Sequence, residues 1–390
     1  MTVFQRNVIA LIKNALSYEK VNIEEPVDWE KVYAVAKQQN IVSLIYCAIV
    51  NLKLNVPEDI LKKFQNSSFN TVFFSELKGR EYQGLYDTFE QRGIDYMLLK
   101  GINLQKLYPK NVVRYMKDAD VLIKEVQYPE IKEIMQELGF RQQGESPHEY
   151  IWVKDSVMVE LHKAISSPYN KDYYGYFGDG WKFAVRKSGH LFNLPKEQEL
   201  AFLVAHFTGH YRRSGIGIFH FTDFYVYLKH NSDIDTDKLN EALDAMGLLK
   251  FYKNILNTLG AWFEGREGDK ATELITSKLF SIGKTDSKAK LENIYAAAKA
   301  QRRFKNKRVA RLYGVIRKIF PEYKAMNIRH PILKKVPVLL PIFWIVRWVD
   351  LIVFHRDRIK QSNRQQRLLK EQSINQYLNE LHTVGLDIEE

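Results

Sequence analysis

The sequence has only one cysteine, Cys47, in 390 residues. A single thiol cannot form a disulfide within the chain, and it excludes a zinc site built from several cysteines. So little cysteine fits a reducing compartment, and we therefore expect a cytoplasmic protein. The 45% hydrophobic content is enough for one large or two ordinary domains with substantial cores.

An uninterrupted apolar run long enough to cross a membrane is also lacking. A spanning helix needs about 20 successive apolar residues. The most apolar stretch lies within residues 331–354 and is interrupted by Pro337, Pro341, Arg347 and Asp350. Residues 3–12 have the apolar rhythm of an amphipathic helix rather than that of a signal peptide. We therefore expect neither a transmembrane segment nor a signal peptide.

The positive charge of the chain is concentrated in one segment. The formal net charge is +12, and residues 299–370 hold 20 of the 58 Lys and Arg residues but only three of the 46 acidic residues. The rest of the chain is therefore slightly acidic. Any polyanion that this protein meets is expected to contact residues 299–370.

Three interpretations of this basic segment stay open. Trp344, Trp348 and Phe354 with their basic neighbours would suit an interfacial helix on anionic lipid, which would place a cytoplasmic protein at the membrane periphery. A core helix with a solvated basic face accounts for the same pattern equally well. Contact with RNA is the third interpretation, because a basic stripe alone is nonspecific.

Residues 1–92 are predicted to be helical and carry no catalytic motif. Asp28 stands in the N-cap position before a periodic apolar run, and residues 41–50 form a second helix candidate. Pro57 opens a longer periodic stretch that should end near Gly93. We expect this helical layer to pack on the sheet that follows it.

Two acids one residue apart lie at the start of a predicted buried strand. Residues 94–99 form a first strand candidate, which a turn at Lys100 and Gly101 ends. Asp118 and Asp120 precede the apolar run of residues 121–123, which is typical of a strand buried on both sides. Alternation places the two carboxylates on one face, with Cα atoms roughly 6 to 7 Å apart. Two carboxylates in that arrangement can bind one cation.

A third acid, Glu160, lies in another apolar strand. Val157, Val159 and Leu161 would point to one side of this strand, while Glu160 and His162 point to the other. Three carboxylates facing one cleft repel each other unless divalent cations or raised pKa values compensate. The sequence therefore predicts a metal site made of the two aspartates and this glutamate.

The region after the third acid is predicted to be mostly helical. An aromatic and glycine-rich stretch, residues 168–180, is expected to be a loop that either borders a base or acceptor pocket or packs on the surface. His206 and Asp223 lie in the helices that follow and are candidates to face the acceptor.

These residues resemble the polymerase-beta-like nucleotidyltransferases, whose pattern is a glycine turn, an Asp-x-Asp strand and a third acid on a later strand. Within that superfamily the chain looks most like a bacterial family that carries Leu-Lys-Gly in place of the usual Gly-Ser turn. The family's Arg-x-Met-x-Asp-x-Asp-Leu-Leu-Val pattern appears here as Arg114, Met116, Asp118, Asp120 and residues 121–123. Because the Gly-Ser turn is missing, the serine contact to the triphosphate is not expected.

The resemblance implies an α+β fold, in which a small mixed sheet forms the nucleotidyltransferase core between large helical N-terminal and C-terminal parts. The expected divisions are a helical region at 1–92, a catalytic core at 93–165, a helical substrate or acceptor region at 166–298 and a basic helical region at 299–390.

The resemblance also implies a two-metal site that uses Mg²⁺ or, alternatively, Mn²⁺. Asp118 and Asp120 would hold the ion that binds a nucleoside triphosphate such as ATP, and both together with Glu160 would hold a second ion. Lys100 and Gly101 would bind the nucleotide. Arg114 would either neutralise phosphate charge in the same way or pair with an acid to orient the strand.

The implied activity is transfer of a nucleoside monophosphate to a hydroxyl acceptor, which is a small molecule, a protein or an RNA, with release of pyrophosphate. The base, the acceptor and the oligomeric state stay open, because fold alone does not specify them. Two alternatives remain beside the enzyme. One is a catalytically idle nucleotide-binding protein, and the other is a peripheral membrane or RNA-binding protein that acts through residues 299–370.

Overall fold

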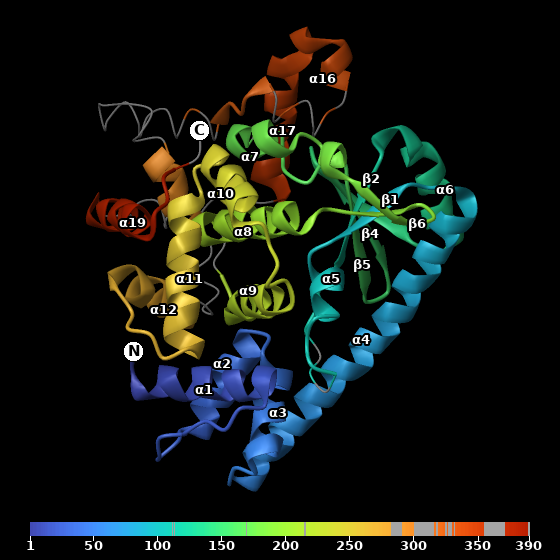
Figure 1. Cartoon of the computed structure of the whole chain (residues 1–390). Coiled ribbons are helices and arrows are strands. Elements are labelled where there is room, and N and C mark those ends of the chain that lie inside the picture. The colour runs from blue at the N-terminus through green and yellow to red at the C-terminus, as the bar shows by residue number, and fades with distance from the viewer. Residues whose placement is uncertain are drawn as a thin grey trace. The chain divides into compact units, whose positions relative to one another are not determined.

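The computed structural model in Figure 1 describes residues 1–281 apart from five positions, together with shorter stretches after them. The five positions are 111, 113, 169, 214 and 215, and the later described residues are 291–299, 316, 319–323, 326, 330, 332–354 and 371–388. The chain divides into two compact units, made mainly of residues 1–208 with 216–283 and of residues 209–215 with 284–389. The sheet and the three acids belong to the first unit.

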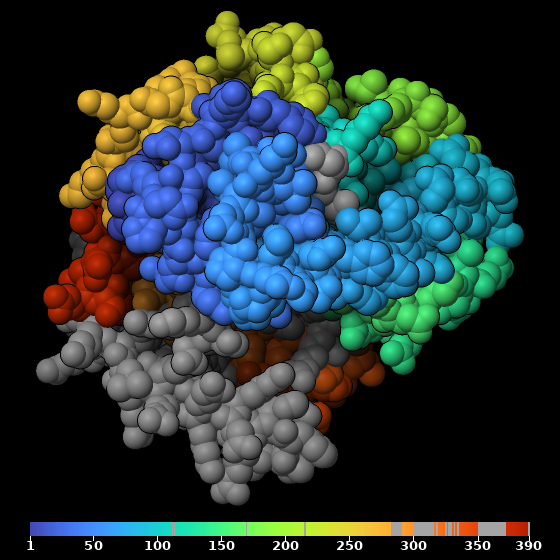
Figure 2. Space-filling model, turned by 90° about the horizontal axis from the view of Figure 1, so that it is seen from below, coloured from blue at the N-terminus to red at the C-terminus, as the bar shows by residue number. Residues whose placement is uncertain are grey.

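Four helices precede the sheet, namely α1 (Val3–Ser17), α2 (Trp29–Gln38), α3 (Val42–Leu52) and α4 (Glu58–Arg92). The Asp28 side chain accepts a hydrogen bond from the backbone N–H of Lys31 and so caps α2, as the sequence predicted. Helix α4 ends where Gly93 takes a φ of 72°, in the left-handed region that glycine adopts without a Cβ penalty. In Figure 2 these helices form one continuous surface of the first unit.

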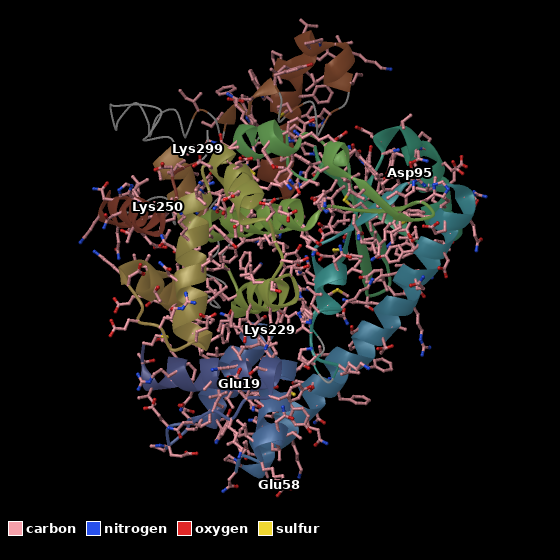
Figure 3. All side chains as sticks on the ribbon, in the orientation of Figure 1. Glu19, Glu58, Asp95, Lys229, Lys250 and Lys299 are labelled. Carbon is pink, nitrogen blue, oxygen red and sulfur yellow. The ribbon has the colours of Figure 1, made fainter. Side chains whose placement is uncertain are left out.

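Helix α4 joins the N-terminal helices to the sheet. It has 35 residues, and Glu58 and Asp95, labelled in Figure 3, lie near its two ends. The C-terminal half of α4 packs on the sheet through Tyr82, Leu85 and Phe89, which belong to the same buried apolar cluster as the strands. The expected packing of a helical layer on the sheet is therefore present.

Seven strands form one mixed sheet in the order β3-β4-β5-β2-β1-β7-β6. They are β1 (Tyr96–Leu99), β2 (Ala119–Ile123), β3 (Arg141–Glu145), β4 (Glu149–Lys154), β5 (Val157–His162), β6 (Val185–Ser188) and β7 (Leu191–Asn193). Strand β2 runs antiparallel to β1 and parallel to β5. A mixed sheet with flanking helices confirms the predicted α+β fold.

Alternation along the central strands gives the sheet two different faces. Val121 and Val159 lie on an apolar face that is covered by α4 and by α6 (Tyr128–Glu137), whose Ile131 and Ile134 are fully buried there. The alternate positions of β2 and β5 point to the opposite face. That face carries the acids, because their positions are one residue out of phase with the buried valines.

Two features of the sheet region differ from the sequence-based expectation. Strands β6 and β7 were not predicted, because they are only four and three residues long and no residue in them is buried. Residues 171–177, expected to be loop, form helix α7 (Lys171–Phe177), which Asn170 caps by accepting a hydrogen bond from the N–H of Tyr173. Capping by Asn outweighed the loop signal of the neighbouring glycines.

Helices α8 (Lys196–Arg213), α9 (Ile218–His230), α10 (Thr236–Ala245), α11 (Leu249–Phe263) and α12 (Lys270–Ser281) follow the sheet. The second unit includes α16 (Ile332–Lys335), α17 (Leu340–Phe354) and α19 (Glu371–Val384). None of the helices in the described ranges combines the length and the apolar character that crossing a bilayer requires.

Part of the predicted basic helical region at 299–390 lies outside the described residues, including residues 300–315 and 355–370. Helix α17 is described, and it exposes Ile342, Ile345, Val346 and Val349. An interfacial helix requires an exposed apolar face of this kind. Contact of this region with lipid or RNA stays a prediction.

Candidate active site

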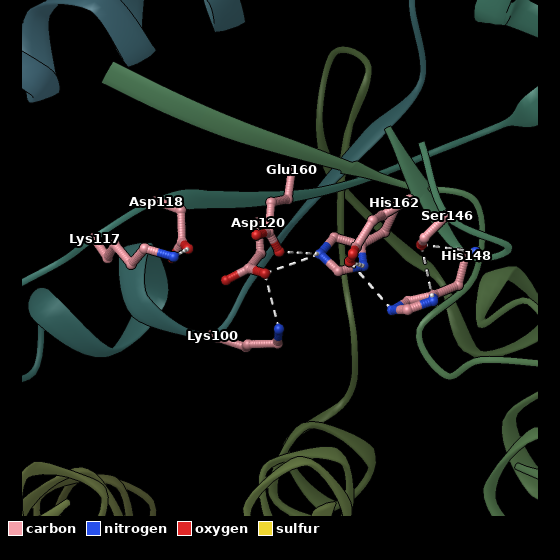
Figure 4. A network of polar contacts seen from close by, with 9 residues as sticks. Lys100, Lys117, Asp118, Asp120, Ser146, His148, Glu160 and His162 are labelled. Atoms are coloured by element: carbon pink, nitrogen blue, oxygen red, sulfur yellow. Dashed lines mark hydrogen bonds and ion pairs between the residues drawn. The ribbon is translucent and has the colours of Figure 1, made fainter. Parts of the chain in front are cut away.

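The register of the two central parallel strands brings the predicted acids together. Asp120 on β2 lies directly opposite Glu160 on β5. Asp118 stands just before β2, two residues from Asp120, and therefore leaves the same face of the sheet. The Asp-x-Asp spacing and the position of Glu160 in its strand thus lead to one cluster, seen in Figure 4.

Asp120 is the centre of this cluster and is buried. Its Oδ1 atom accepts hydrogen bonds from Lys100 Nζ at 2.8 Å and from His162 Nε2 at 2.8 Å (Figure 4). Burial by itself would raise the pKa of Asp120, but the nearby Lys100 ammonium and the His162 hydrogen bond hold that pKa well below its usual range. Asp120 is therefore a stable carboxylate.

Lys100 reaches Asp120 because of an unusual backbone conformation. It follows Leu99, the β1 residue that pairs with Asp120, and it has φ 49° and ψ −117°. This region is otherwise occupied mostly by glycine, and it costs a side-chain-bearing residue roughly 1 to 3 kcal/mol. The burial of Lys100 opposes its charge, but Asp120 raises its pKa overall. The ion pair with Asp120 helps to hold the lysine in this conformation.

Gly101, the next residue, lies close to two side chains. A Cβ atom at this position would lie 2.9 Å from Nη1 of Arg114 and 3.3 Å from the sulfur of Met116. The missing side chain therefore leaves room for the Arg114 guanidinium. The predicted roles of Lys100 and Gly101 in binding a nucleotide stay predictions.

Arg114 forms a bidentate ion pair with Asp223 of α9. Its Nε and Nη2 atoms donate to the two carboxylate oxygens at 2.6 and 2.7 Å, and the hydroxyl of Tyr108 donates to the same carboxylate at 2.7 Å. Of the two roles predicted for Arg114, pairing with an acid is the one that the geometry supports. Asp223, a candidate to face an acceptor, fixes this arginine to α9, and its contact with an acceptor stays a prediction.

The side-chain carboxylates of Asp118 and Glu160 differ from that of Asp120, because neither has a hydrogen-bond partner among the described residues. The nearest cation to Asp118 in that part of the chain is Lys117, at 3.8 Å. Burial and the charge of Asp120 raise the pKa of Asp118. Burial, Asp120 and Asp118 together raise the pKa of Glu160 to about 7. A hard divalent cation stabilises carboxylate oxygens that have no hydrogen-bond donor and repel each other. These residues are therefore suitable ligands for Mg²⁺ or Mn²⁺.

His162 also belongs to the site, although no sequence motif predicted a role for it. Its side chain is 3% exposed, and Nε2 lies 2.8 Å from Asp120 Oδ1 and 3.8 Å from Glu160 Oε2. Burial and Lys100 lower the pKa of His162, although Asp120 opposes this change. Its position two residues after Glu160, on the same face of the strand, is the sequence feature that could have identified His162 as a site residue.

Replacing Glu160 by Gln tests the repulsion between the carboxylates. The pKa of Glu160 rises from its ordinary 4.5 to about 7 on folding, so the folded state binds more protons than the unfolded state between these pH values. The free energy of unfolding of the wild type therefore falls by about 3 kcal/mol as pH rises through that window. Urea unfolding in the presence of a metal chelator measures this effect. The variant should have a higher free energy of unfolding than the wild type at pH 8, and the two free energies should differ much less near pH 5. A difference that does not depend on pH would contradict this explanation.

Comparison with known proteins gives one match. A family model described as "Uncharacterised nucleotidyltransferase" matches residues 25–264, a range that holds all three acids, Lys100 and Arg114. Neither the curated proteins nor the solved structures contain a match to the chain.

Proposed function

The chain belongs to the family described as uncharacterised nucleotidyltransferase, and from this membership we propose that it is a metal-dependent enzyme. The proposed reaction transfers a nucleoside monophosphate from a nucleoside triphosphate to a hydroxyl acceptor. An acceptor oxygen forms a bond to the α-phosphorus while the bond from that phosphorus to the bridging oxygen breaks. The acceptor loses its proton, and pyrophosphate leaves with the electron pair.

The observation that carries this proposal is the group of three carboxylates on one face of β2 and β5. Asp118, Asp120 and Glu160 would hold the divalent cation, Mg²⁺ or Mn²⁺, because the carboxylates of Asp118 and Glu160 have no hydrogen bond within the described part of the chain. Ligand atoms of Asp120 and Glu160 lie within 4.8 Å of each other, and Asp118 stands two residues before Asp120. A bound cation of this kind neutralises triphosphate charge and lowers the pKa of an attacking hydroxyl.

The neighbouring side chains position this acidic group. His162 donates to Asp120 and so fixes the direction of its carboxylate. Lys100 adds a positive charge, on a side chain that is 14% exposed, beside the same carboxylate, and this charge also supports binding of a triphosphate. The pair of Arg114 with Asp223 ties the segment just before the acids to α9, and this contact limits the motion of Asp118.

Incubation with each of the four α-labelled nucleoside triphosphates tests the proposal directly. Purified protein and Mg²⁺ are supplied with and without cell extract, and both label transfer and pyrophosphate release are followed. We expect the wild type, but not Asp118→Asn, to move label onto an acceptor whose nature identifies the acceptor class. Absence of both label transfer and Mg²⁺-dependent triphosphate binding would contradict the proposal.

One observation favours a second candidate, a nucleotide-binding protein without catalysis. Oδ1 of Asp120 is already engaged by Lys100 and His162. If this ion pair persists when a triphosphate binds, Asp120 contributes only one oxygen to a cation. Triphosphate binding that requires Mg²⁺, without release of pyrophosphate in any extract, would identify this candidate.

A further inference from the structure

A second group of potential metal ligands lies on the side of His162 that points away from Asp120. We call it the His-Glu-His cluster, and it consists of His148, Glu149 and His162. Glu149 is the first residue of β4 and lies directly opposite His162 on β5, while His148 immediately precedes it. Strand pairing therefore fixes Glu149 and His162, and the backbone N–H of Lys163 donates to the carbonyl of His148 at 2.7 Å.

The ligand atoms of the cluster converge. His148 Nε2 lies 3.1 Å from Glu149 Oε2, and His162 Nδ1 lies 3.9 Å from the same oxygen. All three atoms are within 4.8 Å of one another. At a tetrahedral ion with bonds of roughly 2.0 to 2.1 Å, ligand atoms lie about 3.3 to 3.4 Å apart. Small side-chain rotations would therefore bring the three atoms to one ion.

His162 Nδ1 gives independent evidence that a cation belongs here. Asp120 Oδ1 accepts a hydrogen bond from the other ring nitrogen, Nε2, so in a neutral imidazole the proton is on Nε2 and Nδ1 carries a lone pair. Nδ1 is buried without a hydrogen-bond partner in the described structure, and it faces the Glu149 carboxylate. Two acceptors that face each other at a buried position are unfavourable unless a cation lies between them.

Both histidines also have the outer contacts that metal-binding histidines need. Such residues usually donate their second ring N–H to a carboxylate, a carbonyl or water, which fixes the ring orientation. His162 has Asp120 in this role, and His148 Nδ1 lies 3.2 Å from the hydroxyl of Ser146. Figure 4 shows Ser146 and His148 on one side of His162 and Asp120 on the other.

We propose that His148 Nε2, Glu149 Oε2 and His162 Nδ1 bind a divalent transition-metal ion of the zinc type. Two imidazoles and one carboxylate suit such an ion, whereas the three carboxylates of the nucleotidyl-transfer site suit Mg²⁺. His148 is partly exposed, so the ion has an open position for water or a ligand. The two metal sites are distinct, and the His162 imidazole links them.

The link has a consequence for Asp120. A metal ion on Nδ1 keeps the remaining proton of the ring on Nε2, where it is donated to Asp120 Oδ1. Occupation of the His-Glu-His cluster therefore holds the central carboxylate of the other site in one orientation. The cluster acts on nucleotidyl transfer through position and not through contact with the reacting groups.

Competition with a chromophoric zinc chelator tests the site in the full chain without any nucleotide. We expect the metal-stripped wild type to bind one Zn²⁺ tightly, and His148→Gln to weaken this binding at least about 100-fold. Ser146→Ala removes only the outer contact and should cost about 10-fold. Asp118→Asn is the matched control, because it removes a ligand of the carboxylate site alone and should change zinc affinity less than threefold. Thermal unfolding checks that each variant is folded.

Cobalt substitution supplies a spectroscopic signature of the ligands. In the wild type and in Asp118→Asn, bound Co²⁺ should show the visible absorption of a tetrahedral site with nitrogen ligands. His148→Gln should lose this absorption. The proposal is overturned if His148→Gln and Glu149→Gln bind zinc as tightly as the wild type. Zinc binding that disappears only in Asp118→Asn would also overturn it. Failure of these tests leaves nucleotidyl transfer unaffected, since no assay of activity enters them.

Discussion

We expect Asp118→Asn to lower the rate of nucleotidyl transfer at least about 1,000-fold, equivalent to about 4 kcal/mol of transition-state stabilisation. The substitution removes a full charge from the predicted cation site while keeping the size of the side chain. Burial and the neighbouring Asp120 already raise the pKa of Asp118, so the ionised form destabilises the folded state. The variant should therefore unfold at the same or a slightly higher temperature than the wild type. Turnover at saturating triphosphate and thermal unfolding are the two measurements.

Asp155→Asn is the matched control for this prediction. Asp155 is an exposed residue in the turn between β4 and β5, with φ 49°, which Asn adopts readily. This variant should retain full activity. Equal activity of Asp118→Asn and Asp155→Asn would contradict the proposal that Asp118 binds the cation. Asp120→Asn is a less clean choice, because it leaves the ammonium of Lys100 buried beside an uncharged amide and so also affects folding.

The largest expected effect on stability is that of the ion pair between Arg114 and Asp223. Replacing Arg114 by Met should lower the free energy of unfolding by about 3 to 5 kcal/mol, because it leaves the Asp223 carboxylate buried, with the hydroxyl of Tyr108 as its one remaining side-chain donor among the described residues. The side chains of the pair are only 10% and 8% exposed. Urea unfolding measures the change, and the double variant Arg114→Met/Asp223→Leu should recover part of it.

An exposed bidentate pair in the same chain is the control. Arg6 donates to Glu24 at 2.7 and 3.0 Å, but both side chains are more than 40% exposed. Water solvates either partner after the other is removed, so Arg6→Met should change stability little. If Arg6→Met and Arg114→Met lowered the free energy of unfolding equally, burial would not strengthen the pair of Arg114 with Asp223.

The periodicity of the sequence determined much of the fold and three residues of the candidate site. Alternation within residues 118–123 and 157–162 placed Asp118, Asp120 and Glu160 on the side of their strands opposite the buried valines, and the structure has them there. Capping signals at Asp28 and Gly93 located helix ends correctly. These features depend on neighbours in sequence, whose geometry follows from the chain itself.

The partners of these residues were decided only by the tertiary structure. Arg114 pairs with a carboxylate 109 residues away, and Lys100 reaches Asp120 from a neighbouring strand through an unusual backbone conformation. No local pattern distinguishes such a lysine or arginine from a solvated one. The same holds for the His-Glu-His cluster, in which Glu149 and His162 come from two paired strands and His148 immediately precedes one of them. The sequence by itself determined which face each acid occupies, because alternation is local. Only the folded chain decided which charges meet, because that depends on contacts between distant segments.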